Sequence, residues 1–384
     1  MRLSQSFFIA CFFALVLTAN GEPQTSAPNA WYFAVSGDSR DCGDLIMPKI
    51  ARSIEDNRRQ TPVQFYWHLG DLRRMFDIDC DFIKRTRPDY DCKNRRPGEY
   101  GPNEIKAYLA AAWDDFVEHQ IRPFGEVSFM IGIGNHELLA NRTRDDFRQR
   151  FRQWLTAQTL QNQRAADAAR GLLTNEGDTY YHFVKNGVDF IYLDDADRNQ
   201  FTSAQVTWLA RVLSLDQQDD SVKTIVAGMH AALPYSTSRN HAMDATCQGL
   251  CSGRQVYDLL YRARRLAGPA ANQKHVYVLA SHSHYFQENI YDTPEHRGQV
   301  LPGWIIGTAG AEQYVDTIRY GYALVTVRPD GTLGVEFKPV TQASLPLASG
   351  PGASELTSFC FEQNKHPGGP DDSLKGNCAC GEAK

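Results

Sequence analysis

The residues of this 384-residue chain best suited to chemistry are Asp, Asn and His side chains that each follow a short apolar run. The densest group is Gly134-Asn135-His136-Glu137, where an amide, an imidazole and a carboxylate follow one another directly. Such oxygens and nitrogens are the usual protein ligands of catalytic metal ions. The other members of the set are Asp38, Asp71, His230, His282 and His284. One such residue alone is more often a turn or cap residue, but the whole set predicts a metal site.

Each of these residues stands just beyond the end of a predicted strand. The strands are short apolar runs, predicted at 31–36, 63–69, 127–133, 190–193, 223–228 and 275–280. Helices are predicted between them at 106–119, 145–160, 202–215 and 253–266. Two further stretches, 180–188 and 321–340, indicate antiparallel strands. Alternating strands and helices favour an α/β fold, whose ligand sites lie outside the carboxyl ends of the strands. We therefore expect the candidate ligands to converge.

Five motifs occur in order along the chain: Gly37-Asp38, Gly70-Asp71, Gly134-Asn135-His136-Glu137, His230 and Ser281-His282-Ser283-His284. In this order they resemble the motifs of the calcineurin-like metallophosphoesterases, a family that includes the purple acid phosphatases. The resemblance covers about residues 31 to 340. It implies an α/β/β/α fold, a two-sheet sandwich flanked by helices, and a centre of two divalent or mixed-valence metal ions of Fe, Zn or Mn.

By that resemblance, Asp71 bridges the two metal ions. The remaining ligands would be Asn135, His230 and His282 for one ion and Asp38 and His284 for the other. Two cations joined by a carboxylate lie roughly 3.5–4 Å apart, polarise the phosphoryl oxygens and activate a water molecule. His136 resembles the family's outer histidine, which stabilises or protonates the leaving oxygen, and Glu137 is placed to orient it.

Two positions depart from the family pattern. Arg40 stands where the family usually has a His ligand, and Arg74 stands where purple acid phosphatases have a Tyr. Arg does not ligate a metal, because it stays protonated at accessible pH. The first metal site therefore keeps only Asp38, Asp71 and His284, which leaves open a weak or an empty first site.

Arg40 has two possible roles on these grounds. Its planar donors are suited to clamp a substrate phosphate, which would make Arg40 a catalytic residue beside His136. Alternatively, Arg40 forms a structural ion pair with Asp41 or Asp44.

The N-terminus has the pattern of a secretory signal peptide. The apolar run 7–17 follows Arg2 and is itself followed by the small residues Ala19-Asn20-Gly21, which predicts cleavage after residues 1–21. The run is too short to span a bilayer, and no later run is long and apolar enough to do so. The predicted location is therefore extracytoplasmic, either secreted or periplasmic.

The rest of the chain divides into three parts by composition. Residues 22–30 contain two prolines and indicate a flexible lead-in. Residues 31–340 form the predicted catalytic domain, with a charged insertion at 75–105 as a surface loop or a substrate-contacting rim. Residues 341–384, rich in Gly, Pro and Ser, indicate a disulfide-tied C-terminal tail.

The cysteine content agrees with an oxidising compartment. Of nine cysteines, Cys11 lies in the predicted signal peptide, which leaves an even number for disulfides. The local pairs Cys80–Cys92 and Cys247–Cys251 are plausible, although the sequence does not fix the connectivity. The other cysteines are Cys42, Cys360, Cys378 and Cys380.

These observations predict a secreted, metal-dependent phosphoric ester hydrolase that uses metal-activated water, with phosphomonoesters as the favoured substrates. The formal net charge of −5 argues against a nucleic-acid partner and leaves a small-molecule phosphate ester as the expected one. The alternatives are a phosphodiesterase or nucleotide hydrolase of the same fold, or a non-catalytic metal- or phosphate-binding protein. The last would be favoured by an empty first metal site. The oligomeric state is not predicted.

Overall fold

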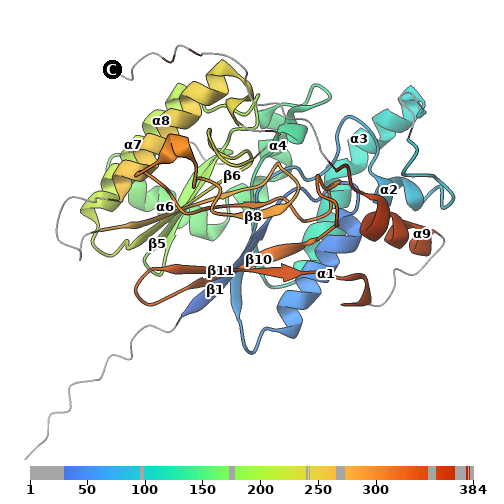
Figure 1. The fold of residues 1–384 in the computed structure, drawn as a ribbon, viewed down its shortest axis with the longest axis horizontal. Coiled ribbons are helices and arrows are strands. Elements are labelled where there is room, and N and C mark those ends of the chain that lie inside the picture. Colours follow the sequence, from blue (N-terminus) through green and yellow to red (C-terminus); the bar gives the residue numbers. More distant parts are fainter. Residues whose placement is uncertain are drawn as a thin grey trace, which may run out of the picture.

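Two mixed β-sheets form the centre of the molecule, and helices cover their outer faces (Figure 1). The predicted α/β fold class, a two-sheet sandwich flanked by helices, is confirmed. The computed structural model describes residues 30–95, 99–172, 178–238, 241, 243–264, 273–344, 352–367, 378 and 380. The predicted signal peptide, 1–21, and all but the last residue of the lead-in, 22–30, lie outside these residues.

The first sheet has five strands in the order β11-β10-β1-β2-β3. Strands β1, β2 and β3 are parallel, whereas β10 pairs antiparallel with both β1 and β11. The carboxyl ends of the three parallel strands therefore lie at one edge of the sheet. The strands are β1 (Trp31–Ser36), β2 (Val63–His68), β3 (Ser128–Ile131), β10 (Gly321–Val327) and β11 (Leu333–Pro339).

The second sheet has six strands in the order β4-β5-β6-β7-β9-β8. Its four central strands are parallel, and an antiparallel strand stands at each edge. The ends of β6 and β7 therefore also lie at one edge. The strands are β4 (Tyr181–Lys185), β5 (Val188–Leu193), β6 (Thr224–Met229), β7 (His275–Ala280), β8 (Phe286–Glu288) and β9 (Gly303–Ile306).

Aromatic side chains from both sheets fill the space between them. The ring of Phe190 from the second sheet lies edge-on to Phe33 and Phe65 of the first, with centroids 5.0 Å apart in both pairs. The indole of Trp67 donates a hydrogen bond to the hydroxyl of Tyr181 at 3.1 Å. Full burial of one such ring contributes about 1.5–3 kcal/mol, so this packing holds the strand ends of the two sheets close together.

Helices pack against the outer faces of both sheets. Figure 1 shows α7 and α8 side by side over the second sheet, and α1 packs beside the first. The helices are α1 (Gly43–Asp56), α2 (Cys80–Lys84), α3 (Pro102–Phe116), α4 (Arg144–Arg150), α5 (Arg152–Leu155), α6 (Gln158–Ala169), α7 (Ser203–Gln218), α8 (Cys247–Ala263) and α9 (Ala353–Ser358).

Several observed elements differ from the predicted ones. Helix α1 was not predicted, because Pro48 inside it interrupts the sequence pattern of a helix. The predicted helix 145–160 is divided among α4, α5 and the start of α6. Strands β8 and β9, of three and four residues, were not predicted because runs this short carry little periodicity.

Four disulfides join the eight cysteines outside the predicted signal peptide. They are Cys42–Cys360, Cys80–Cys92, Cys247–Cys378 and Cys251–Cys380. The predicted pair Cys80–Cys92 is confirmed, whereas the predicted pair Cys247–Cys251 is wrong. These two cysteines lie one turn apart on the same face of α8, so both thiols point outward and each reaches a tail cysteine.

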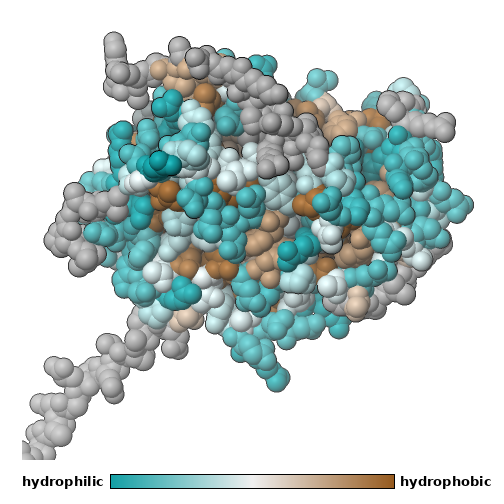
Figure 2. Space-filling view, viewed as in Figure 1, coloured by the Kyte–Doolittle hydropathy of each residue, from teal (hydrophilic) through white to brown (hydrophobic). Residues whose placement is uncertain are grey.

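The outside of the molecule offers little continuous apolar surface on the face drawn in Figure 2. Hydrophilic residues cover most of this face, and apolar residues form small separate patches. Within the described part of the chain, no helix has both the length and the apolar character needed to cross a membrane.

Candidate metal centre

The predicted metal ligands stand on loops at the carboxyl ends of strands from both sheets. Hydrogen bonds join these loops across the sheets: the amide of Gly37 donates to the carbonyl of Ile306 at 2.9 Å. Four of the predicted ligands place their ligand atoms within 4.8 Å of one another, and these are Asp38, Asp71, His230 and His282. The remaining two, Asn135 and His284, each lie beside one of these four: Asn135 next to His230 and His284 next to Asp38.

The backbone of the site is held in an unusual conformation. Positive φ angles occur at Asp38 (59°), Asp71 (57°), His282 (66°) and His284 (47°). A residue other than Gly in this region costs about 1–3 kcal/mol and persists only where surrounding contacts enforce it. Four such residues at one point of the molecule are typical of a functional site.

Two glycines permit the close approach of these loops. Gly70 has a φ of 99°, which favours Gly, and a side chain there would collide with the backbone of Gly134. At Gly134, a Cβ would lie 2.3 Å from Oδ1 of Asp71. The glycines that precede Asp71 and Asn135 therefore allow these two residues to reach the same point.

Each of the two carboxylates has one oxygen fixed and one oxygen free. Oδ2 of Asp38 accepts the amide of His282 at 2.7 Å, and Oδ1 of Asp71 accepts the amide of His136 at 3.0 Å. Oδ1 of Asp38 and Oδ2 of Asp71 are buried and have no hydrogen-bond partner. A buried anionic oxygen without a donor is costly, so both atoms require a nearby cation.

His230 directs a lone pair at two further oxygens. Its Nδ1 lies 3.0 Å from the carbonyl of Leu69, which only accepts, so Nδ1 carries the ring proton. In that tautomer Nε2 is an acceptor, yet it lies 3.1 Å from Oδ1 of Asn135 and 3.2 Å from Oδ1 of Asp71. Three converging acceptor atoms fit a metal ion.

His282 adds a further nitrogen to this set. Its Nδ1 is buried and has no hydrogen-bond partner. A ring nitrogen of His282 and a carboxylate oxygen of Asp38 belong to the group of ligand atoms within 4.8 Å of one another, and such a mixed oxygen and nitrogen donor set is of the kind that binds Zn, Fe or Mn. The donor set and its unsatisfied atoms thus fit one metal ion.

Neighbouring groups keep the carboxylates of the cluster ionised. Burial alone would raise the pKa of Asp71, but His136, His230 and Arg40 hold that pKa well below its ordinary value. Burial alone would lower the pKa of His230, but Asp71 raises it to about 10. Asp71 thus favours a positive charge at Nε2 of His230, which either a proton or a metal ion would supply.

Glu137 fixes the loop that carries Asp71. Its carboxylate accepts the amides of Gly134 at 2.8 Å, and of Asp71 and Leu72 at 3.0 Å each. Burial, followed by the charge of Asp71, raises the pKa of Glu137 to about 8. The sequence placed Glu137 as the residue that orients His136, whereas its observed contacts position Asp71.

Arg40 lies inside the cluster. Its Nη2 is 2.7 Å from Nε2 of His284, and its Nη1 contacts Nε2 of His136 and lies 3.8 Å from Oδ2 of Asp71. Only 9% of the residue is exposed. The guanidinium therefore occupies the space next to the residues that were expected to hold the first metal ion.

The alternative partners predicted for Arg40 pair with other arginines. Asp41 accepts from Arg74 at 2.7 Å and from Arg95 at 2.6 Å, and Asp44 accepts from Arg73 at 2.6 Å. Arg74, which stands at the position of the purple acid phosphatase Tyr, thus directs its side chain toward Asp41.

Some contacts of the site involve residues that the sequence did not single out. The side-chain Nδ2 of Asn199 lies 3.2 Å from Nε2 of His282, and the ring of Tyr314 stacks on His284 with centroids 4.9 Å apart. The carboxylate of Asp195 accepts the amide of His230 at 3.1 Å. Asp195 follows the end of β5 just as the ligands follow their strands, so its position was a usable signal. No spacing marks Asn199 or Tyr314.

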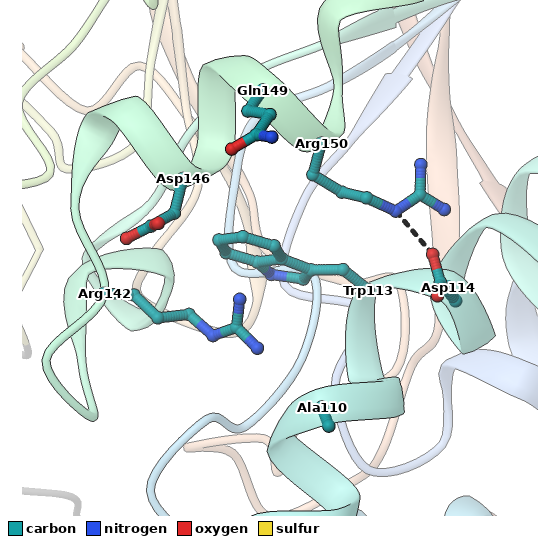
Figure 3. Close-up of a pocket in the computed structure, with 7 residues that line it drawn as sticks. All are labelled: Ala110, Trp113, Asp114, Arg142, Asp146, Gln149 and Arg150. Carbon is teal, nitrogen blue, oxygen red and sulfur yellow. Dashed lines mark ion pairs between the residues drawn. The ribbon is translucent and has the colours of Figure 1, made fainter.

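The cavity drawn in Figure 3 has a volume of about 580 Å³ and contains none of the predicted site residues. It lies between α3 and α4, and its lining side chains already pair with one another. The guanidinium of Arg142 lies 4.0 Å from the ring centre of Trp113, and Arg150 forms an ion pair with Asp114 at 2.6 Å. This cavity is distinct from the candidate metal centre.

No protein-family model and no curated protein sequence matches the chain. Solved structures similar in fold include a purple acid phosphatase from yellow lupin (Lupinus luteus) seeds, with 14% identity and a TM-score of 0.48 over 81% of this chain. They also include GAP50 of Plasmodium, described as the anchor in the inner membrane complex, with 13% identity and a TM-score of 0.45 over 81% of this chain and 84% of GAP50. This chain spans about half (52%) of the lupin phosphatase chain.

A third similar structure is the hypothetical protein PH1004 from Pyrococcus horikoshii OT3, with 11% identity and a TM-score of 0.32 over 87% of this chain and 99% of that protein. All three likenesses are distant.

Proposed function

We propose that this chain is a metal-dependent hydrolase of phosphoric esters and that phosphomonoesters are its substrates. The observation that carries the proposal is the convergence of two buried carboxylates, Asp38 and Asp71, with two imidazoles, His230 and His282, whose ligand atoms lie within 4.8 Å of one another. A buried arginine next to a metal site suits a phosphate group, since both offer positive charge to its oxygens.

The chain would hold a metal ion through Asp38, Asp71, Asn135, His230 and His282. When bound, the metal supplies a polarised water molecule and positive charge for the phosphoryl group. The water oxygen forms a bond to phosphorus, and the bond from phosphorus to the ester oxygen breaks with its electron pair on that oxygen. A proton from the water ends on the alcohol, so the products are the alcohol and inorganic phosphate.

The protein's own cation in this reaction is Arg40. The fork of its guanidinium would bind the non-bridging oxygens of the phosphate, and these contacts strengthen as negative charge develops in the transition state. A monoester carries more negative charge than a diester, and a site with two positive centres therefore favours the monoester.

His136 is proposed as the residue that positions Arg40. Its Nδ1 donates to the backbone carbonyl of Arg74, and its Nε2 faces Nη1 of Arg40. The ring in this tautomer has no proton left for a leaving group. These contacts support the stabilising role of His136 over the protonating one.

The test is hydrolysis of p-nitrophenyl phosphate and bis(p-nitrophenyl) phosphate by purified protein before chelation, after it, and after return of Zn²⁺, Mn²⁺ or Fe²⁺. We expect a metal-dependent preference for the monoester. The variant His230→Ala should lose bound metal and activity together, while His366→Ala, which changes an exposed histidine, should keep both. Full activity of the chelated protein or of His230→Ala would refute the proposal, and a preference for the diester would favour a phosphodiesterase.

A second candidate function is non-catalytic binding of a metal ion or of phosphate. The position of Arg40 among the expected ligands of the first ion favours it, because a catalytic centre with two ions would then be incomplete. Metal and phosphate binding without hydrolysis of either ester would support this candidate.

We also propose that the protein works outside the cytoplasm, as secreted or periplasmic proteins do, and that residues 341–384 form a tail bound to the catalytic domain 31–340. One disulfide joins Cys42, the residue before α1, to the tail, and two join α8 to it, which supports both proposals. Thiol titration of the unfolded, non-reduced protein should find almost no free thiol. Several free thiols would contradict an oxidising location.

A further inference from the structure

We infer that the guanidinium of Arg40 takes the place of the first metal ion, so that each chain binds one metal ion and uses Arg40 as the second cation of the site. The inference deepens the proposed function, but its stoichiometry does not depend on hydrolysis. Its basis is the arrangement of Arg40, Asp71, His136 and His284, which differs from what a centre of two ions requires.

The two histidines beside Arg40 direct acceptor nitrogens at it. Nδ1 of His284 lies 2.6 Å from the carbonyl of Glu312, and Nδ1 of His136 contacts the carbonyl of Arg74. Because a carbonyl only accepts, both Nδ1 atoms carry the ring proton, and both Nε2 atoms are left with a lone pair. These are the lone pairs that would bind a metal ion, and both accept hydrogen bonds from Arg40 instead.

Asp71 joins the guanidinium to the metal site as a bridging carboxylate would. Its Oδ1 lies 3.2 Å from Nε2 of His230, inside the donor set described above, whereas its Oδ2 lies 3.8 Å from Nη1 of Arg40. The two oxygens of Asp71 thus serve two different cations. Asp38 completes the set on the metal side, because one of its carboxylate oxygens belongs to the cluster with Asp71, His230 and His282.

A second metal ion next to Arg40 would face strong electrostatic repulsion. Arg stays protonated at accessible pH, so its charge cannot be removed to admit the ion. Arg40 is also enclosed, with 9% of its surface exposed, and three partners hold its guanidinium. A second ion would require Arg40 to leave these partners.

The consequence is a centre with one removable and one permanent positive charge. The guanidinium presents planar donors that match two oxygens of a phosphate group. Chelation should therefore abolish metal-dependent hydrolysis and still leave weak binding of inorganic phosphate, which a centre of two ions would lose completely.

The test is the metal content of the purified protein after equilibration with Co²⁺ and removal of free ion, measured by mass spectrometry and by the visible absorption of Co²⁺. We expect one ion per chain in the wild type. Arg40→His replaces the guanidinium with a neutral ligand and should raise the content toward two ions per chain. Arg74→His is the matched control, since Arg74 pairs with Asp41, and its content should stay at one.

Two ions per chain in the wild type would overturn the inference, as would an Arg40→His variant that folds and stays at one ion. A second measurement is calorimetric binding of inorganic phosphate to the chelated protein. The wild type should retain binding that Arg40→Ala loses, and equal binding by both would also overturn the inference. Because neither measurement uses hydrolysis, a protein that binds one ion but cleaves no ester would refute the proposed function alone.

A different observation indicates which phosphate esters the site would prefer. Among the described residues, the large hydrophobic side chains that are exposed are Phe76, at 54%, and Val184, at 37%. Phe76 lies at the centre, with its ring 5.3 Å from that of His136 and 4.8 Å from the guanidinium carbon of Arg74. The geometry points to Phe76 as a wall for a planar, apolar leaving group, which makes aryl-type phosphomonoesters the preferred substrates if the proposed function holds.

The test compares the KM of an aryl phosphate with that of glycerol phosphate. Phe76→Ala should raise the KM for the aryl phosphate roughly tenfold, as for the loss of one stacking contact, and leave kcat and the KM for glycerol phosphate unchanged. Phe76→Tyr should restore the aryl preference, and Val184→Ala should change nothing. An equal rise in KM for both substrates would contradict the assignment, because it would show that Phe76 acts only by packing against His136. Absence of activity on both in the wild type would refute the proposed function instead.

Discussion

Arg40 and Arg73 are both buried arginines near the end of a strand in the first sheet, but their partners differ in kind. Arg73 is fully buried and surrounded by carboxylates: Asp44 at 2.6 Å, Asp81 at 3.0 Å, Asp79 at 3.6 Å, and Asp115. Arg40 meets a single carboxylate, at 3.8 Å, and two imidazoles. The charge of Arg73 is thus balanced within the protein, whereas much of the charge of Arg40 is left for a ligand.

The partners of Arg73 also indicate what the insertion at 75–105 does. Asp79 and Asp81 belong to it, and the disulfide Cys80–Cys92 closes the loop that carries them. Together with Arg73 they attach the insertion to α1 through Asp44. The insertion therefore stabilises the fold next to the site, whereas Arg40 faces the site itself.

The largest effect is expected from Arg73→Met. The change leaves several buried carboxylates without their cation, and removal of one partner from a buried ion pair costs about 3–5 kcal/mol. Urea unfolding should show this loss, whereas Arg52→Ala, which removes an exposed arginine, should leave the midpoint unchanged. A loss below about 1 kcal/mol for Arg73→Met would contradict the structural role of the network.

Removal of the disulfide Cys42–Cys360 tests whether this bond keeps the loop that carries Arg40 in place. The bond joins the residue two positions after Arg40 to the C-terminal segment. The double change Cys42→Ser with Cys360→Ser should lower the free energy of unfolding by about 2–4 kcal/mol and should also lower kcat/KM. Removal of Cys251–Cys380, which anchors the tail to α8, should leave kcat/KM unchanged. Equal kinetic effects of the two removals would contradict a specific link to Arg40.

Arg40→Met should affect catalysis more than stability, unlike Arg73→Met. Loss of a charged donor that binds the transition state should lower kcat/KM by roughly tenfold to a thousandfold. The free energy of unfolding should fall by less than it does in Arg73→Met, because Arg40 meets one carboxylate, at 3.8 Å, and Asp71 keeps His230 beside it. Steady-state kinetics and urea unfolding of the same preparation check both parts. Unchanged kinetics with a large loss of stability would make Arg40 a structural residue.

The smallest effect concerns pH and a buried histidine outside the site. His182 lies 2.8 Å from Asp167 and 2.9 Å from Asp189, and Asp216 faces the same group. Burial alone would lower its pKa, but Asp189 and Asp167 raise it to about 10. A raised pKa stabilises the folded state fully below the ordinary value of 6.5, and this contribution is lost as the pH rises to about 10.

The melting temperature of the wild type should therefore exceed that of His182→Gln most at pH 6.5, and the difference should shrink toward pH 10. The pKa of Asp216 is raised by burial and by Asp189, so this residue also makes the folded state less stable as the pH rises. A difference that is constant across this range would contradict a charged His182.

The sequence predicted the strand ends and the residues that meet there, because Asp38, Asp71, Asn135 and His230 each follow an apolar run directly. It also predicted the fold class, since these runs alternate with helical segments. It did not predict where the guanidinium of Arg40 lies. That position depends on side chains contributed by distant parts of the chain.

Two other features could not be predicted from the sequence, for physical reasons. The helix α1 contains Pro48, which conceals it from a pattern-based prediction. The pairing of Cys247 and Cys251 with tail cysteines depends on how the tail returns to α8, and the spacing along the helix does not encode this path.

The claim that one metal ion and Arg40 together form the site is tested most directly by a crystal structure of the protein with Mn²⁺ and inorganic phosphate, in which anomalous scattering locates the metal. We predict one anomalous peak, bounded by Asp71, Asn135 and His230, and a phosphate oxygen within hydrogen-bond distance of an Arg40 that still contacts His284. Two anomalous peaks roughly 3.5–4 Å apart, with Arg40 turned away from His284, would contradict it.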